Sequence, residues 1–140
     1  MAAIRPYANA YDLLRESGLR PTRQRLALAK LLFDGTDRHM RAEQLHGEAL
    51  AAGIRISLAT VYNTLHQFTE VGLLREVVVE SGRAYFDTNI SDHHHFFCED
   101  SGELRDIPAD QLSIDRLPDP PAGKRVKRVD VILHLTDPED

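Results

Sequence analysis

A helical pattern that leads directly into two β-rich segments is the feature that most restricts the fold of this chain. Ser57 is a favourable N-cap, and apolar residues then recur at i, i+3, i+7 and i+10, on one face of a helix that ends at Gly72. Those apolar residues are Leu58, Val61, Leu65 and Phe68. Segments 73–79 and 83–87 follow, and Gly82 between them can supply the positive φ of a tight turn. The sequence therefore predicts a helix followed by a β-hairpin.

Three shorter helices are predicted before that helix. They occupy residues 11–17, a segment that begins at the N-cap Thr22, and residues 42–52. Several helices followed by a two-stranded wing are typical of a winged helix-turn-helix DNA-binding domain, which we place at residues 1–87.

The second half of the chain has a mixed pattern. Strands are predicted at residues 95–99, 103–107 and 128–135, with a short helix at residues 108–117. A segment of about fifty residues buries little core alone, so we expect two copies to pair as a homodimer. The expected fold class is α+β. It comprises the winged helix-turn-helix domain, a hinge at residues 88–91, and a small C-terminal α/β domain at residues 92–140 for dimerisation and metal or haem sensing.

Charge is divided unevenly along the chain. Residues 1–85 contain 11 Lys or Arg against 9 Asp or Glu, whereas residues 86–140 contain 6 against 13. This division predicts an anionic ligand for the first part and a cationic ligand for the second. The overall charge of −5 argues against indiscriminate binding to nucleic acid.

Composition also excludes several classes of protein. The one cysteine, Cys98, cannot form an internal disulfide, which fits a reducing cytoplasm, and it lacks the partner that a CxxC zinc motif requires. No apolar run approaches a membrane span, and residues 1–10 lack the apolar region of a signal peptide. No nucleophile–base pair or paired-acid motif is evident, so we do not expect an enzyme.

Three consecutive histidines, His93, His94 and His95, precede an apolar segment. Imidazole is the commonest protein ligand for transition metals. If the segment is a strand, His93 and His95 point to one face and His94 points to the other, so the triplet can serve two sites. A metal or haem site is the functional interpretation, and a solvated histidine-rich turn is the alternative.

The polar side of the helix after Ser57 is suited to reading DNA. It carries Thr60, Tyr62 and Asn63, and its first acidic residue is Glu70 at the far end. Asn63 can hydrogen-bond to adenine, and Tyr62 can pack on a thymine methyl group in the major groove. A solvated helix face is the alternative interpretation.

Three arginines are candidates for contacts with the DNA backbone. Arg20, Arg23 and Arg25 flank the start of the helix capped by Thr22, where phosphate positioning is the natural role, and Arg20 can reach a minor groove. Ordinary solubilising surface charge is the alternative. A two-fold dimer predicts a pseudo-palindromic operator, which we expect to be A/T-rich.

The chain resembles the ferric uptake regulator (Fur) superfamily. The resemblance rests on residues 18–25 (GLRPTRQR), on Ala59–Tyr62 (ATVY) and on the histidine triplet. Within the superfamily, residues 56–74, 86–97 and 129–135 are similar to the iron response regulator (Irr) branch. Asn63 and the absence of CxxC pairs point to the same branch.

The resemblance implies a sensing site near the hinge. Its matching positions are His39, Glu80, His93, His95 and Asp106. This mixture of imidazole and carboxylate groups suits a divalent transition metal such as Fe, Mn or Zn. A site with ligands from both domains would couple metal occupancy to their relative orientation.

A second family site is only partly matched. Asp92 and His94 match two of its ligands, while Ser113 and Val129 stand at the other two positions and cannot coordinate. His134, Asp115 or a haem would have to complete it. The cysteine-bound structural zinc of the family is not expected, and haem would be held by His93, His94 and His95.

The resemblance implies a transcriptional regulator of iron and haem homeostasis. An Irr-type protein is active at low iron and is released from DNA by haem. The alternative is a Fur-like repressor that uses Fe²⁺ or Mn²⁺ as corepressor. Mobility-shift experiments with metal, haem and chelator distinguish the two.

Overall fold

The computed structural model describes residues 9–80, 83–91 and 93–138. The chain divides into two compact units, residues 1–90 and residues 91–140. Among the residues described, no helix is long and apolar enough to cross a membrane.

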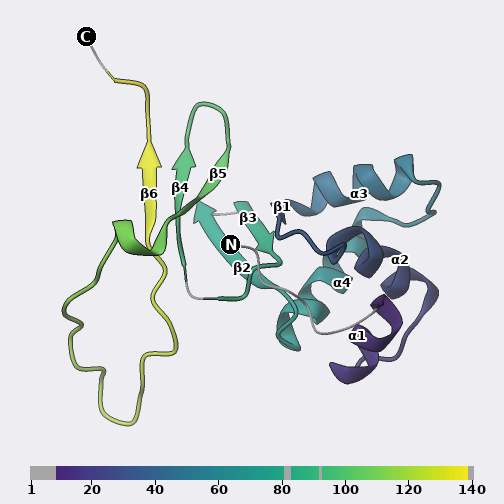
Figure 1. The fold of residues 1–140 in the computed structure, drawn as a ribbon, viewed down its shortest axis with the longest axis horizontal. Helices are drawn as coiled ribbons and strands as arrows, with labels where there is room; N and C mark the ends of the chain where they lie inside the picture. The colour runs from purple at the N-terminus through teal and green to yellow at the C-terminus, as the bar shows by residue number, and fades with distance from the viewer. Residues whose placement is uncertain (1–8, 81–82, 92, 139–140) are drawn as a thin grey trace. The chain divides into compact units, whose positions relative to one another are not determined.

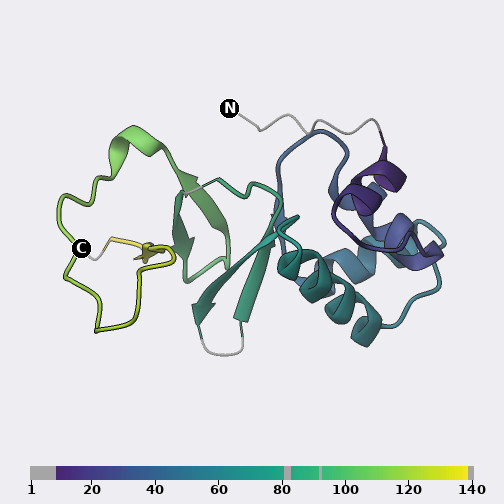
Figure 2. The same cartoon turned by 90° about the horizontal axis from the view of Figure 1, so that it is seen from below.

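The described residues of the first unit form four helices and a small antiparallel sheet (Figure 1). Its elements are α1 (Ala10–Glu16), α2 (Arg23–Leu32), β1 (His39–Met40), α3 (Ala42–Ala51), α4 (Leu58–Glu70), β2 (Arg75–Glu80) and β3 (Arg83–Asp87). The strand order is β1-β3-β2. Figure 2 shows α4, drawn in teal, leading into the β2–β3 hairpin. The predicted helices and wing are thus confirmed. Strand β1 was not predicted, because two residues carry no periodic signal.

Local capping explains where α2 and α4 begin and where α4 ends. The Thr22 hydroxyl accepts the backbone N–H of Arg25, and the Ser57 hydroxyl accepts that of Thr60. Both side chains therefore satisfy N–H groups that a helix start leaves unpaired. At the other end of α4, Gly72 adopts a φ of +84°, a conformation that costs glycine little. This turn redirects the chain from α4 into β2.

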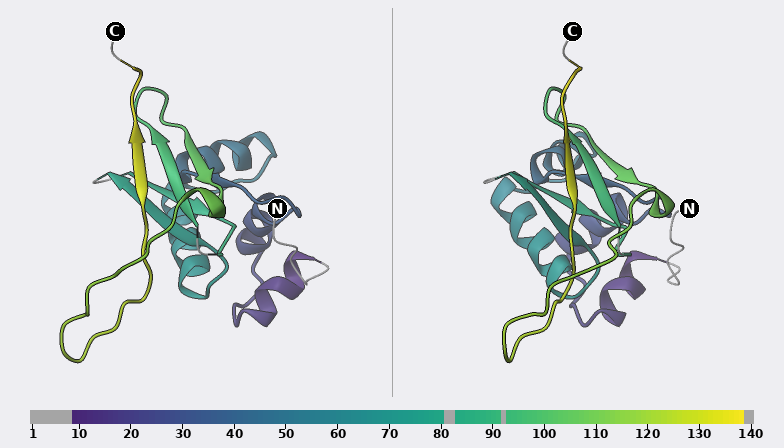
Figure 3. Two further views of the ribbon diagram at one scale, coloured as in Figure 1. Left: turned by 60° about the vertical axis from the view of Figure 1, so that its left-hand side comes forward. Right: turned by 90° about the vertical axis from the view of Figure 1, so that its left-hand side faces the viewer.

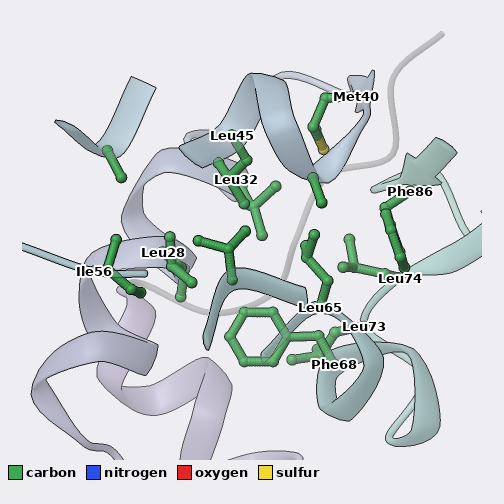
Figure 4. Close-up of a cluster of buried hydrophobic side chains, with 14 of the residues drawn as sticks. Leu28, Leu32, Met40, Leu45, Ile56, Leu65, Phe68, Leu73, Leu74 and Phe86 are labelled. Carbon is green, nitrogen blue, oxygen red and sulfur yellow. The ribbon is translucent and has the colours of Figure 1, made fainter. Parts of the chain in front are cut away.

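The apolar face of α4 lies at the centre of the core of the first unit (Figure 4). Val61, Leu65 and Phe68 are fully buried, and Leu58 is partly buried against the same cluster. Side chains from the other three helices, from β1 and from β3 complete the core. Because the apolar face is packed inward, the opposite face of α4 is left to solvent.

In its described part, the second unit is a three-stranded sheet with little helix (Figure 3). It contains β4 (His94–Cys98), β5 (Leu104–Ile107), the 3₁₀ turn η1 (Ala109–Gln111) and β6 (Ile132–Leu135). The order is β5-β4-β6, with β5 antiparallel and β6 parallel to β4. Residues 112–131 connect η1 to β6 as one long loop.

Two predictions for the second unit are wrong. Residues 108–117 form only the short turn η1, and the strand expected over residues 128–135 begins at Ile132. Ile114 and Leu117 are exposed, so neither side chain is packed into the core of the described residues. Short helices without such packing are marginal in water.

Candidate functional site

Two histidine side chains of the second unit converge on one carboxylate. His95 on β4 is paired with Asp106 on β5, and its Nε2 lies 3.3 Å from Asp106 Oδ1. His93 Nε2 lies 3.5 Å from the same oxygen, and the two imidazole centroids are 4.5 Å apart. The side chains of His95 and His93 are 3% and 8% exposed, whereas that of Asp106 is 48% exposed. Two buried nitrogen donors thus meet one oxygen donor at a partly open edge.

This arrangement has the chemistry of a metal site. One ligand atom from each of His93, His95 and Asp106 lies within 4.8 Å of the others. Imidazole nitrogen and carboxylate oxygen together suit Fe²⁺, Mn²⁺ or Zn²⁺ better than Ca²⁺, which prefers oxygen alone. The donor set therefore fits a divalent transition metal.

His94 points away from this cluster, as strand alternation predicts. Its Nδ1 accepts the backbone N–H of Val131 at 3.0 Å, so the neutral ring carries its proton on Nε2. His93 and His94 line a pocket of about 170 Å³ with Ile107, Pro108, Ala109 and Leu112. This volume is below the roughly 300–1,000 Å³ of typical small-molecule sites.

The second predicted group of ligands is not brought together. His134 is paired with Phe97 across β6 and β4, and its ring packs edge-on against Phe97. Because Phe97 and His94 are three positions apart on β4, they point to opposite faces of the sheet. His134 and His94 therefore lie on opposite faces too, and His134 Nδ1 is instead 3.4 Å from Glu99 Oε1. The third member, Asp92, lies outside the described residues.

The sheet of the first unit separates two other predicted ligands, His39 and Glu80. His39 is paired with Asp87, which is paired on its other side with Arg75 at the start of β2. Glu80 lies at the far end of β2, opposite Arg83, and its Oε2 is 3.5 Å from Arg83 Nη1. The rise from Arg75 to Glu80 is roughly 16 Å. Ligands of one ion, with bonds of about 2 Å, cannot be so far apart.

Asp87 is a metal-competent residue that sequence reasoning missed. Its side chain is buried, with 1% of the residue exposed, and one carboxylate oxygen accepts the backbone N–H of Asn89. As direct partners on adjacent strands, His39 and Asp87 have Cβ atoms about 5 Å apart. The signal in the sequence was an acid at the last position of a predicted strand. Only the unpredicted strand β1 places that acid beside His39.

The exposed face of α4 carries the predicted base-reading residues. Asn63 is exposed and Tyr62 is half-buried, with its ring stacked near that of His66. The Tyr62 hydroxyl donates to Glu43 Oε2 on α3 at 2.7 Å. This hydrogen bond lowers the pKa of the Glu43 carboxyl and raises that of the Tyr62 hydroxyl. Glu43 thus orients the Tyr62 ring, a contact with no local sequence signal. Thr60 contributes a hydroxyl 2.9 Å from that of Ser57.

The three arginines near the start of α2 divide into two kinds. Arg20 and Arg23 are exposed. Arg25 is held within the unit, because its Nε and Nη2 donate to Gln67 Oε1 at 3.2 and 3.1 Å and its Nη1 donates to the Arg20 carbonyl at 2.9 Å. Arg25 therefore ties α2 to α4 and supports the segment that carries Arg20. The sequence predicted phosphate contacts for all three, with Arg20 also able to reach a minor groove, and gave no sign of the contact with Gln67.

Comparison with known proteins gives the family. The model of the "Ferric uptake regulator family" matches residues 16–134. The chain belongs to this family. It is 35% identical over 106 residues to the peroxide-responsive repressor PerR of Staphylococcus aureus, covering 74% of this chain and 70% of that protein. It is 34% identical over 95 residues to the ferric uptake regulation protein of Neisseria gonorrhoeae, covering 67% of this chain and 66% of that one.

Solved structures of Fur proteins have the same fold. The ferric uptake regulator of Pseudomonas aeruginosa with manganese superimposes with a TM-score of 0.72 at 26% identity, over 93% of this chain and 98% of that one. The regulator of Vibrio cholerae gives a TM-score of 0.70 at 24% identity, over 91% and 98%, a likeness of fold. Fur-family proteins are dimeric, metal-responsive, DNA-binding transcriptional regulators and not enzymes.

Proposed function

We propose that this Fur-family protein is a regulator of iron homeostasis whose affinity for its operator is controlled by a divalent metal ion. The observation that carries this proposal is the pair of buried imidazoles, His93 and His95, directed at one oxygen of Asp106. Burying two histidine rings beside a carboxylate is costly unless their polar atoms are satisfied, and a metal ion satisfies all three groups at once.

The proposed ligands are His39, Asp87, His93, His95 and Asp106. Asp87 takes the place first assigned to Glu80, because it is buried and is paired with His39, whereas Glu80 lies at the distal end of the hairpin. Asp87 also lies only six positions before His93 in the chain. Fe, Mn or Zn bound to this set would supply a positive charge that holds neutral imidazoles and carboxylates together.

The proposed DNA-binding residues are those of the exposed α4 face and the exposed arginines. Asn63 and Tyr62 read base edges, assisted by Thr60, while Arg20 and Arg23 contact phosphates or a minor groove. Arg25 supports both groups from within the unit. A family dimer presents two such surfaces, which fits a pseudo-palindromic, A/T-rich operator.

The test uses two histidine variants of the same strand system. His95→Ala is expected to lower Mn²⁺ affinity at least 10-fold and to remove the Mn²⁺ dependence of operator binding. His134→Ala, which removes an imidazole outside the cluster, is expected to leave both unchanged. The measurements are calorimetric titration of metal-free protein and mobility shift at fixed salt. Equal Mn²⁺ affinity for His95→Ala and the unaltered protein would overturn the proposal.

A second candidate function is a regulator that haem releases from DNA. Similarity to the Irr branch and histidines on both faces of β4 favour it. In this case the protein is active at low iron, and haem bound by His93, His94 or His95 lowers operator affinity. The pocket beside His94, about 170 Å³, is too small for a porphyrin, so haem would have to displace the cluster.

The haem proposal is tested with the triple variant His93→Ala, His94→Ala, His95→Ala. In the unaltered protein, bound haem is expected to show a low-spin spectrum with histidine ligation and to release the protein from DNA. In the variant, haem is expected to produce neither the spectrum nor the release. By linkage, operator DNA should weaken haem binding by the same factor. Haem-dependent release that persists in the triple variant would remove the triplet from this role.

A further inference from the structure

A basic segment of the second unit, Lys124–Arg128, has no part in the sites described above. Lys124, Arg125, Lys127 and Arg128 are all exposed. They are four of the 6 Lys and Arg residues in residues 86–140, which contain 13 Asp and Glu. Positive charge is thus concentrated in five positions of an otherwise acidic unit.

Most of this charge is not neutralised by the residues that the structure describes. Arg128 Nε donates to Asp130 Oδ2 at 2.9 Å. Lys124, Arg125 and Lys127 make no ion pair with any residue in the described part of the chain. Like charges this close repel each other, and the segment buries no apolar core that would offset the repulsion. The cations therefore do not stabilise the fold of their own unit.

The surrounding loop presents these cations outward. The backbone N–H of Lys124 donates to the Pro121 carbonyl at 3.0 Å, and Gly123 has a φ of +78°, the features of a type II turn. Pro118 and Pro120 further restrict the backbone just before this turn. Figure 3 shows residues 112–131 leaving the sheet as an extended loop. The basic segment thus follows an ordered turn on an exposed loop.

We propose that Lys124, Arg125 and Lys127 contact the phosphate backbone of the DNA duplex to which the protein binds. This inference rests on the proposed function, which already brings a polyanion to the protein. A duplex offers one negative charge per roughly 1.7 Å of its axis, so three neighbouring cations can all be satisfied.

An acidic surface of a second copy is a poorer partner. Three of the acidic side chains of the unit are already engaged within the described part of their own chain. Glu99 lies against His134, Glu103 accepts from Arg105 and Asp130 accepts from Arg128. Phosphates of DNA, in contrast, have only exchangeable counterions as competitors.

The test measures the salt dependence of DNA binding. The triple variant Lys124→Gln, Arg125→Gln, Lys127→Gln is compared with the unaltered full chain on an operator duplex selected from a random library and on a random duplex of equal length. The slope of log K against log [salt] is negative, and each lost phosphate contact should reduce its magnitude by about 0.9. Three lost contacts should therefore reduce it by about 2.7 per engaged loop. The loss should be equal on both duplexes, because phosphate contacts carry no sequence information.

A matched single-charge control separates this effect from net charge. Arg125→Gln should reduce the magnitude of the slope by about 0.9. Arg105 is an exposed arginine of the same unit that is paired with Glu103, and Arg105→Gln should leave the slope unchanged. An unchanged slope in the triple variant overturns the inference while leaving the proposed function intact. Failure of the unaltered protein to bind either duplex would instead overturn the proposed function. If sedimentation showed that the triple variant loses its dimer while its slope is unchanged, a second copy would be the partner and the inference would be wrong.

Discussion

The two units differ in how much of their apolar surface they bury themselves. The first packs side chains from all four helices and from its sheet into one core. In the described part of the second unit, the buried apolar residues are Phe97, Leu104 and Ile107, while Leu133 and Leu135 on the edge strand β6 remain exposed. Burial is the main stabilising term in folding, so the first unit should be stable on its own. The second should depend on what binds to it, namely metal and a second copy.

The largest expected effect tests the independence of the first unit. Phe68→Ala removes a fully buried ring at the centre of its core, beside Phe33. The expected loss is about 3–5 kcal/mol in the unfolding free energy of this unit, with or without metal. Native-state hydrogen exchange of the α4 amides measures it. A loss below about 1 kcal/mol, or one that appears only when metal is removed, would break the comparison.

The second prediction tests the dependence of the second unit on metal. Free Mn²⁺ at 100 times its dissociation constant should stabilise this unit by about 2.7 kcal/mol, because only the folded state holds the ligands together. The measurement is native-state hydrogen exchange of the β4 and β5 amides, in the presence of Mn²⁺ and in the presence of a chelator. His95→Ala should abolish the difference, and His134→Ala should retain it. Equal protection with and without metal would show that the second unit is as self-sufficient as the first.

The third prediction concerns the proposed DNA-binding surface of the first unit. Asn63→Ala should cost about 1–3 kcal/mol of binding to the cognate operator and relax discrimination, since it removes a base contact. Arg23→Ala should weaken binding to all duplexes alike and reduce the salt slope by about 0.9. If Asn63→Ala weakened cognate and random duplexes equally, Asn63 would not read bases.

The smallest expected effect is on stability, and it is tested by comparing one ion pair from each unit. Arg38 donates to Glu48 through both terminal nitrogens, at 2.9 and 2.6 Å, and this hydrogen bonding lowers the pKa of the Glu48 carboxyl. The resulting stability is present above the unfolded-state pKa, near 4.5, and is lost as pH falls through the lower folded-state pKa. Because both side chains are partly exposed, we expect only about 0.5–1 kcal/mol.

Glu48→Gln should therefore lower the melting temperature at pH 7 and flatten its fall between about pH 5 and pH 3. The pair of Glu103 and Arg105 in the second unit is the control, since both groups lie exposed on or beside a single strand. Glu103→Gln should not change the melting temperature measurably. A pH profile that is the same for Glu48→Gln and the unaltered protein would exclude a stabilising role for the Arg38 pair.

Local sequence signals predicted much of the first unit. Ser57 and Thr22 mark helix starts because capping depends on residues only a few positions away. The alternation of His93, His94 and His95 was equally local, since it follows from the pleat of one strand. These features need no knowledge of the rest of the chain.

The features that could not be predicted depend on contacts distant in sequence. Asp87 becomes a candidate ligand only because β1 pairs His39 with it. Glu43 and Tyr62 are 19 positions apart, and Arg25 and Gln67 are 42 apart. Glu80 was misplaced for the same reason, because the register of the hairpin decides which end of β2 lies near His39. In the second unit, the proline at position 108 suggested a helix at 108–117, but only a short turn forms there and Ile114 and Leu117 are exposed.

The parallel pairing of β4 with β6 has a consequence for the order of folding. The β4–β5 hairpin brings His95 to Asp106 through a short connection, so the elements of the histidine cluster can form early. The pairing of His95 with Ile132, and the Val131 hydrogen bond to His94, must wait for a segment separated by a long loop. Pairings across long loops form slowly, because loop closure must precede the contacts that stabilise it. During synthesis, the winged-helix unit can thus fold, and can encounter DNA, before the sheet behind the histidine cluster is complete.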